Sequence, residues 1–373
     1  MTSTVFALSF HADYKCRHSG ACCTADWDVP VELPVYKSLA EAVARGSLTV
    51  AADARGLSPF IVEPDLPDAA AAMIERTTRG DCVFFERGSH LCVVHRVLGE
   101  AALPATCRHF PRVALRDGRG TFVTLSHYCP TAASMLFREN VATTIEASPP
   151  AFPPADYEGL SIGGDDLPPL LAPRTLMDAA GYSAWERHMV ARCADAPSPE
   201  SVIATLARDA RILRRWRPGV HTLAEAVASL PGAFETADLP TTLAASLALD
   251  REVMTAVPDD LRPERDESGL EVAYRCEVRD HWPLFNLPLN RYLAAKAFAS
   301  WTAYQGRGVA TIVRGLEVAL ALVRVAAARH CRDASRALDR GLLLESVRSA
   351  DFALNHLAVG EDLAAVWSHV EGA

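Results

Sequence analysis

Lysine is nearly absent from this chain of 373 residues, in which Lys15, Lys37 and Lys296 are the only lysines among 37 basic residues. The excess of arginine and alanine is typical of GC-rich coding sequence, and we draw no functional conclusion from it. Acidic residues outnumber basic ones, which gives a formal charge of -9 and an isoelectric point near 5.8. This balance argues against general affinity for nucleic acid or for an anionic membrane.

Targeting and membrane signals are also missing. The first residues, MTSTVFALSFHADYKC, lack a basic leader, a long apolar core and a cleavage site, so we expect no signal peptide. The most apolar stretch, residues 309–328, carries Arg314, Glu317 and Arg324, and its apolar residues recur at helical spacing. This pattern predicts a buried amphipathic helix rather than a membrane span. We therefore expect a cytoplasmic protein in which thiols stay reduced, and this disfavours a disulfide knot.

Several cofactor motifs do not occur either. The chain has no C-x-x-x-C-x-x-C spacing, which disfavours a radical enzyme of the usual S-adenosylmethionine type. No G-x-G-x-x-G follows a predicted strand, so a Rossmann site is not expected. A P-loop and a nucleophile elbow are likewise lacking.

What the chain does have is cysteine, concentrated at one end. Of ten cysteines, seven fall in the first 129 residues, namely Cys16, Cys22, Cys23, Cys82, Cys92, Cys107 and Cys129. The other three, Cys193, Cys276 and Cys331, stand singly in apolar or helical stretches, and we expect them to be small buried hydrophobes.

The placement of the clustered cysteines predicts a metal site. Cys82 and Cys92 lie near the ends of a predicted hairpin, Cys107 ends a helical turn, and Cys129 opens a helix whose N–H groups favour a thiolate. Thiolates from four such segments can form a tetrahedral or a cubane cage. Spacing alone leaves zinc and iron–sulfur both open, although more than four thiols suit a cluster. Further candidate ligands or proton donors are His11, His18, His90, His95, His109 and His127.

The chain changes character near residue 140, and this predicts an α+β protein. Residues 1–138 contain short β-like pieces, with hairpins around turns at 87–90 and 117–120, and should form a small mixed α/β cysteine-rich domain. Residues 139–174 read as a linker rich in proline and glycine. Residues 175–373 have helical patterns and should form a mainly α-helical domain.

Three stretches carry a family resemblance: CRHSGACCTADWDVPV, DCVFFERGSHLCVVHRVLGEAALPATCRHFPR and LSHYCPTAA. Together with LNRYLAAKAF and ADFALNHLA, they resemble the flagellin lysine-N-methylase family. That family shares its cysteine-rich part with a broader group of zinc- or iron-chelating cluster proteins. One departure concerns the first motif, where the family has another cysteine and this chain has residues 17–21. Either that thiol is dispensable or His18 takes its place.

The resemblance implies an enzyme that binds a [4Fe–4S] cluster and transfers a methyl group from S-adenosylmethionine to an amine. The implied acceptor is lysine of a protein such as flagellin, and the implied cluster ligands are the seven clustered cysteines, with zinc as the alternative metal. Two other functions stay open. One is a cluster-dependent tailoring enzyme that acts on a small molecule or peptide, and the other is a non-catalytic zinc- or iron-binding interaction protein.

Methyl transfer from a sulfonium donor sets further requirements. The donor loses its positive charge, and a lysine acceptor must first be deprotonated, so the site needs carboxylates and a base or a pocket of low dielectric. We expect this site where the cluster meets the helical domain. The candidate catalytic residues are His95, His109, Asp28 and Tyr292. The candidate donor-binding residues are Asp26, Arg112, Asn290 and Arg291.

Overall fold

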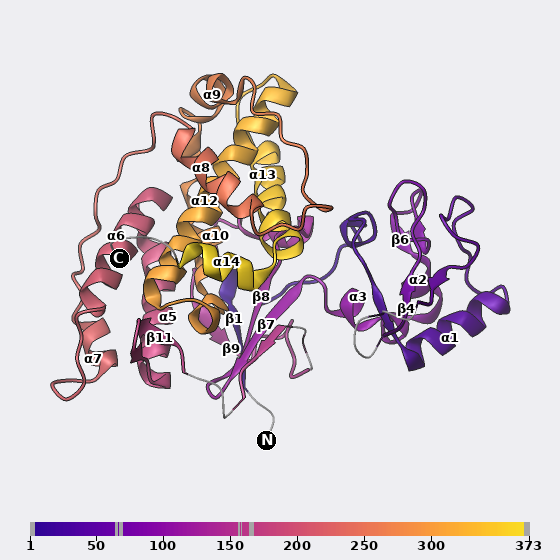
Figure 1. Ribbon diagram of the computed structural model, residues 1–373, viewed down its shortest axis with the longest axis horizontal. Coiled ribbons are helices and arrows are strands. Elements are labelled where there is room, and N and C mark those ends of the chain that lie inside the picture. The colour runs from indigo at the N-terminus through magenta and orange to yellow at the C-terminus, as the bar shows by residue number, and fades with distance from the viewer. Residues whose placement is uncertain are drawn as a thin grey trace.

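The structure is a computed structural model that describes residues 4–63, 66, 70–155, 157, 159–163 and 168–368. It has the predicted α+β fold and divides into two lobes (Figure 1). The small lobe comprises the described residues within 16–110, and the large lobe comprises residues 4–15 and the described residues within 111–368. The chain begins in the large lobe, leaves it to build the small lobe and then returns, so the small lobe is an insertion into the large one.

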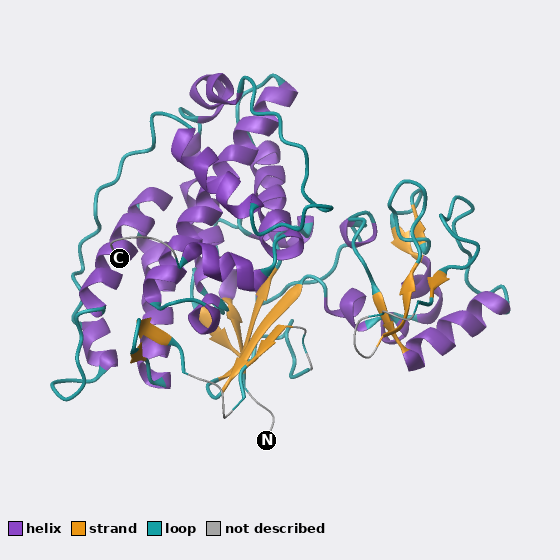
Figure 2. Ribbon diagram, in the orientation of Figure 1, coloured by secondary structure: helices purple, strands orange, loops and turns teal. Residues whose placement is uncertain are grey.

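The large lobe contains a mixed five-stranded sheet with the strand order β10-β7-β8-β1-β9 (Figure 2). Its strands are β1 (Val5–Leu8), β7 (Arg112–Asp117), β8 (Gly120–Leu125), β9 (Ile145–Ala147) and β10 (Gly159–Ser161). β7 and β8 form one of the two predicted hairpins, whereas β1 runs parallel to β8. Because side chains alternate along a strand, Leu115 and Phe122 face the helices, and Ala114 and Val123 pack with α4 (Pro130–Met135) on the other face.

Helices supply most of the core of the large lobe. They are α5 (Ala179–Asp195), α6 (Pro199–Leu213), α7 (Leu223–Ala228), α8 (Ala244–Met254), α9 (Leu270–Ala273), α10 (Asn286–Ala297), α11 (Thr302–Gln305), α12 (Val309–Ala334), α13 (Arg340–Phe352) and α14 (Gly360–Trp367). Single π-helical turns, Tyr274–Val278 and Ala353–Leu357, continue α9 and α13. A two-stranded ribbon, β11 (Leu170–Ala172) with β12 (Thr175–Leu176), precedes these helices.

α12 is the central helix and packs against α6, α8, α10 and α13. It confirms the predicted buried amphipathic helix over residues 309–328, since most of its residues are buried. The charged residues within 309–328 are paired: Arg324 donates to Glu200, and Arg314 pairs with both Glu252 and Glu317. Within the described part of the chain, no helix has the length and apolar character needed to cross a membrane.

The small lobe has its own core. Its strands are β2 (Pro30–Glu32), β3 (Phe60–Ile61), β4 (Ala70–Ile74), β5 (Phe85–Glu86) and β6 (Leu91–Cys92), and its helices are α1 (Leu33–Ala44), α2 (Val93–Leu98) and α3 (Ala105–His109). β2, β4 and β3 form an antiparallel sheet, and β5 pairs with β6 as the other predicted hairpin. Val31, Leu39 and Phe84 are completely or almost completely buried in this lobe.

The two lobes do not follow the domain boundaries expected from the sequence. β1, β7 and β8 fall within the expected domain 1–138, yet they share a hydrophobic core with the helices of the large lobe, because one apolar face of their sheet needs a helical cover. The expected linker, residues 139–174, contributes β9, β10 and β11 to the same lobe. Its residues 156, 158 and 164–167 lie outside the described part of the chain.

Candidate metal centre

All seven amino-terminal cysteines line one cavity of about 350 Å³. They come from six segments: Cys16 where the chain crosses between the lobes, Cys22 and Cys23 in the turn Ala21–Cys23, Cys82 before β5, Cys92 at the end of β6, Cys107 in α3, and Cys129 immediately before α4. Backbone contacts hold these segments together. The Cys82 amide donates to the Cys23 carbonyl at 2.7 Å, and Cys92 pairs with Phe85 across the β5–β6 hairpin.

The cavity lies where the cores of the two lobes meet. Cys82 belongs to the small-lobe core, and Cys23, Cys92 and Cys107 pack against that core. Cys129 instead belongs to a cluster of the large lobe that also contains Tyr14, whose Oη atom is 3.7 Å from Cys129 Sγ. A group bound to thiols from both sides would therefore link the two lobes.

Burial keeps several of these thiols protonated. It raises the pKa of Cys107 well above its ordinary value and raises the pKa of Cys82 to about 12. Cys92 behaves differently, because a hydrogen bond from the Cys23 thiol lowers its pKa to about 7. The same thiol lowers the pKa of Cys22, whose Sγ atom is 3.9 Å from Cys23 Sγ. Metal binding at the neutral thiols releases their protons.

A buried arginine lies beside the thiols. Arg76 follows β4, is only 5% exposed and forms a β-bridge with Cys82. Its Nη1 and Nη2 atoms have no hydrogen-bond partner among the described residues. Its charge lowers the pKa of Cys82 and Cys107, in opposition to the larger effect of burial. A buried guanidinium without an acceptor indicates that a negatively charged group belongs next to it.

The thiols surround the cavity rather than converge at one point. Tetrahedral zinc with Zn–S bonds of about 2.3 Å places its sulfurs about 3.8 Å apart. Cys22 and Cys23 have this spacing, but within the described ranges no three Cys, His, Asp or Glu side chains are close enough to hold one metal ion. Seven thiols around one wide cavity, with a buried cation beside them, are chemically compatible with a polynuclear anionic group as well as with a single ion.

Two of the predicted catalytic and donor-binding residues reach the cavity. His95 lines it and stacks on His18 with a ring separation of 5.1 Å. Arg112 also lines it, and its guanidinium lies over the ring of Tyr14 at 5.3 Å. The predicted histidine His90 is a third imidazole in the lining. The cavity therefore combines thiols with cationic and basic side chains.

The other candidates of the small lobe point elsewhere. Asp26 is exposed and pairs with Arg55 at 3.2 Å, and Asp28 is exposed as well. His109 packs near the ring of Tyr157 at 6.0 Å and does not line the cavity. Asp26, Asp28 and His109 thus follow a cysteine of the cavity in the sequence but do not line the cavity themselves.

The candidates of the helical region support the fold instead. Asn290 is buried, and its Nδ2 atom donates to the Ala196 carbonyl at 2.9 Å. Arg291 is buried too and donates to the carbonyls of Leu136, Arg138 and Val141. These hydrogen bonds hold the segment that follows α4 against α10. Since main-chain carbonyls take up these donors and neither residue lines the cavity, we do not retain Asn290 and Arg291 as donor-binding candidates.

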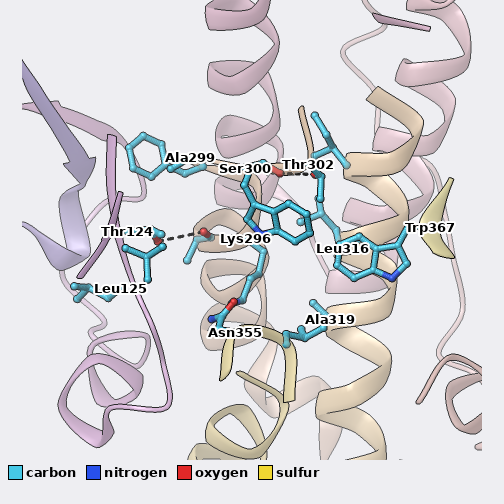
Figure 3. Close-up of a pocket in the computed structure, with 17 residues that line it drawn as sticks. Thr124, Leu125, Lys296, Ala299, Ser300, Thr302, Leu316, Ala319, Asn355 and Trp367 are labelled. Carbon is cyan, nitrogen blue, oxygen red and sulfur yellow. Dashed lines mark hydrogen bonds between the residues drawn. The ribbon is translucent and has the colours of Figure 1, made fainter. Parts of the chain in front are cut away.

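Tyr292 belongs to a buried polar network between α10 and α13. Its centre is Asp351, which has no exposed surface and pairs with Lys296. Asp351 also accepts hydrogen bonds from Tyr292 Oη at 3.2 Å, from Asn355 Nδ2 at 2.9 Å and from the backbone amide of His127. Lys296 and Asn355 line a small cavity of about 70 Å³ (Figure 3). Sequence reasoning missed Asp351 because most of its partners, His127, Tyr292 and Lys296, lie in two segments that are distant in the sequence.

An aromatic junction, formed by Trp27, Phe110, Tyr128, Phe352 and His356, connects the small lobe to this network. The rings of Trp27 and His356 are 4.7 Å apart. His356 Nε2 is 2.8 Å from Ser126 Oγ, and burial lowers the His356 pKa to about 4, so the ring is neutral. Tyr128 of this junction directly precedes Cys129, so rings of both lobes pack together close to a cysteine of the cavity.

The isolated cysteines follow the prediction in two of three cases. Cys193 and Cys331 are buried in the helical core, whereas Cys276 is exposed.

Comparison of the chain with protein-family models, curated proteins and solved structures gave no match.

Proposed function

We propose that this protein is an iron–sulfur-cluster methyltransferase that transfers a methyl group from S-adenosylmethionine to an amine, with protein lysine as the favoured acceptor. One observation carries the proposal: seven cysteines from six segments surround a single cavity, and one of them, Cys82, forms a β-bridge with Arg76, a buried residue whose Nη atoms have no hydrogen-bond partner among the described residues. The resemblance of the cysteine segments to flagellin lysine-N-methylases supports the choice of reaction. The free thiols suit the reducing cytoplasm.

The residues around the cavity divide into three roles. Cys92, Cys107, Cys129 and one of the adjacent pair Cys22 and Cys23 would hold a [4Fe–4S] cluster, with Cys82 as the next candidate. When bound, the cluster supplies an iron that can take the amino and carboxylate groups of the methyl donor. Arg112, which also lines the cavity, offers a bidentate partner to that carboxylate.

The acceptor amine requires a proton acceptor and a negative neighbour. His95 and Glu100 line the cavity and supply these groups. An ammonium first loses its proton to His95. The nitrogen lone pair then forms the N–C bond as the C–S bond breaks, and the sulfonium becomes a neutral thioether. The thiol-lined cavity is open, so a protein side chain, a peptide or a small amine can enter it.

The proposal is tested by incubating the anaerobically purified protein with cell lysate and S-adenosylmethionine labelled in its methyl group. We expect label in the protein fraction, recovered as methyllysine after hydrolysis. Label only in the small-molecule fraction would assign a tailoring enzyme. No transfer to either fraction, by protein that carries a full cluster, would leave a non-catalytic metal protein.

The role of Arg76 gives a separate prediction. Arg76→Met removes the buried charge at similar volume. We expect the purified variant to hold less than half of the wild-type iron per chain, because the guanidinium offsets the negative charge of the cluster. Any cluster that remains should have a lower reduction potential, since a nearby cation favours the reduced form.

The matched control for this variant is Arg55→Met. Arg55 lies in the same lobe but is exposed and pairs with Asp26. Iron content measured by colorimetric assay should be close to that of the wild type in this control. Equal iron content and equal potential in both variants would show that Arg76 has no part in holding the cluster.

A further inference from the structure

A second large cavity lies in the large lobe, far from the thiols. It has a volume of about 440 Å³ and is bordered by α6, the first turns of α12 and the end of α14. α6 is on the side of the large lobe opposite to the small lobe (Figure 1). Its size falls within the range of about 300–1,000 Å³ that is typical of small-molecule sites. Nothing in the proposed methyl transfer uses this cavity.

The charge of the lining is strongly one-sided. Arg211, Arg214, Arg307 and Arg314 all contribute to it. Arg314 is neutralised by Glu252 and Glu317, at 2.9 Å and 2.7 Å. The other three arginines have no ion-pair partner in the described part of the chain. Arg211 and Arg307 are exposed and Arg214 is partly exposed, so three guanidiniums without a carboxylate partner face this hollow. Such a cluster favours binding of an anion, and it stands out because the chain as a whole is acidic.

Two buried donor atoms of the lining lack an acceptor in the described part of the chain. Arg314 Nε and Trp367 Nε1 are buried and have no hydrogen-bond partner among the described residues. Trp367 forms part of the wall between this cavity and the small cavity of Figure 3, where its indole nitrogen lies on the side away from Ser300 and Lys296. The floor between the arginines is apolar and includes Ala207, Ala210 and Val313.

We propose that this arginine cavity binds a small organic phosphate. A phosphate group offers several acceptor oxygens and a double charge, and guanidiniums bind it in bidentate fashion. A single carboxylate would leave at least one of the three guanidiniums without a partner. The apolar floor gives room for a compact organic part beside the phosphate. The ligand binds at a site separate from the cysteine cavity.

The experiment is isothermal titration calorimetry on the full-length protein at 0.15 M salt, with inorganic phosphate, pyrophosphate and adenosine monophosphate as probes. The test variant is Arg211→Gln/Arg214→Gln. The matched control is Arg215→Gln/Arg217→Gln, which removes the same charge at the end of α6 from two exposed arginines outside the lining. We expect adenosine monophosphate to bind the wild type and the control alike, and to bind the test variant at least ten-fold more weakly.

Each outcome is decisive. Tighter binding of adenosine monophosphate than of the two inorganic probes assigns an organic phosphate and supports the proposal. Binding that both double variants weaken equally would show general attraction to a basic surface and overturn it. Binding of the inorganic probes alone would also overturn the assignment of an organic ligand, as would no binding of any probe at millimolar concentration. The methylation assay is independent of all these results.

Discussion

Replacing Cys107 by serine is expected to reduce the iron content of the anaerobically purified protein from about four atoms per chain, the content of one [4Fe–4S] cluster, to less than about one. Cys107 lies in α3, packs against the small-lobe core and faces the cavity. Serine is a poor ligand for iron, so the cage loses one corner. The brown colour of the protein, its acid-labile sulfide and its iron should decline together.

Binding of the methyl donor should be lost with the cluster. We expect Cys107→Ser and Cys129→Ser to bind S-adenosylmethionine at least ten-fold more weakly than the wild type, as measured by calorimetry. Cys276→Ser is the matched control, because this thiol is exposed and lies outside the cavity. Loss of the cluster with unchanged donor binding and methyl transfer would make the cluster structural. About one zinc per chain in the wild type, without labile sulfide, would refute the iron–sulfur assignment.

Asp351→Asn is expected to destabilise the large lobe by about 3–5 kcal/mol, the cost of removing one partner of a buried ion pair. Asp351 is fully buried and accepts hydrogen bonds from three groups besides its pairing with Lys296. Asparagine keeps the shape but leaves the ammonium of Lys296 without a counter-charge. The free energy of unfolding from urea titration measures this effect.

The double variant Lys296→Met/Asp351→Asn separates the pair from its surroundings. We expect it to be more stable than Asp351→Asn alone, since it no longer buries an unpaired ammonium. If both variants were as stable as the wild type, the network would contribute nothing to stability. Iron content should also fall in Asp351→Asn. Asp351 accepts a hydrogen bond from Asn355, and the next residue, His356, packs against Trp27 in the aromatic junction between the lobes.

Acid should weaken the same region. Although burial by itself raises the pKa of Asp351, the charge of Lys296 and the hydrogen bonds hold it below its ordinary value, so its contribution is present near neutral pH and lost as the pH falls below about 4. Burial also lowers the pKa of His127 and His356 to about 4. In the unfolded chain these histidines have an ordinary pKa of about 6.5, so the unfolded state binds protons at a higher pH than the folded state does. The free energy of unfolding should therefore decline as the pH falls from about 6.5 to about 4.

The sequence by itself determined the α+β class, the hairpins and the central helix α12, because these depend on local periodicity and turn residues. β7 and β8 alternate around Gly118 and Gly120, and residues 309–328 repeat at helical spacing. It also identified the seven cysteines, since their concentration is visible without any fold. Each of these features depends on residues that are close together in the sequence, so it can be predicted without knowledge of the tertiary structure.

Only the tertiary structure decided which residues face the cysteines. In the sequence, Asn290 and Arg291 were as suitable candidates as Arg112. In the structure they donate hydrogen bonds to main-chain carbonyls and do not line the cysteine cavity. Arg76 carried no signal, because a lone arginine after a strand becomes informative only when it is buried without a partner.

The assignment of strands to lobes likewise needed three dimensions. β1, β7 and β8 flank the small lobe in the sequence but pair with each other in the large one. Their apolar face is covered by helices from distant parts of the chain, and no local pattern records which partner will cover a face. The sequence locates reactive side chains along the chain. Their burial and the lack of a partner for a charge depend on packing between distant segments, and therefore only the tertiary structure could show them.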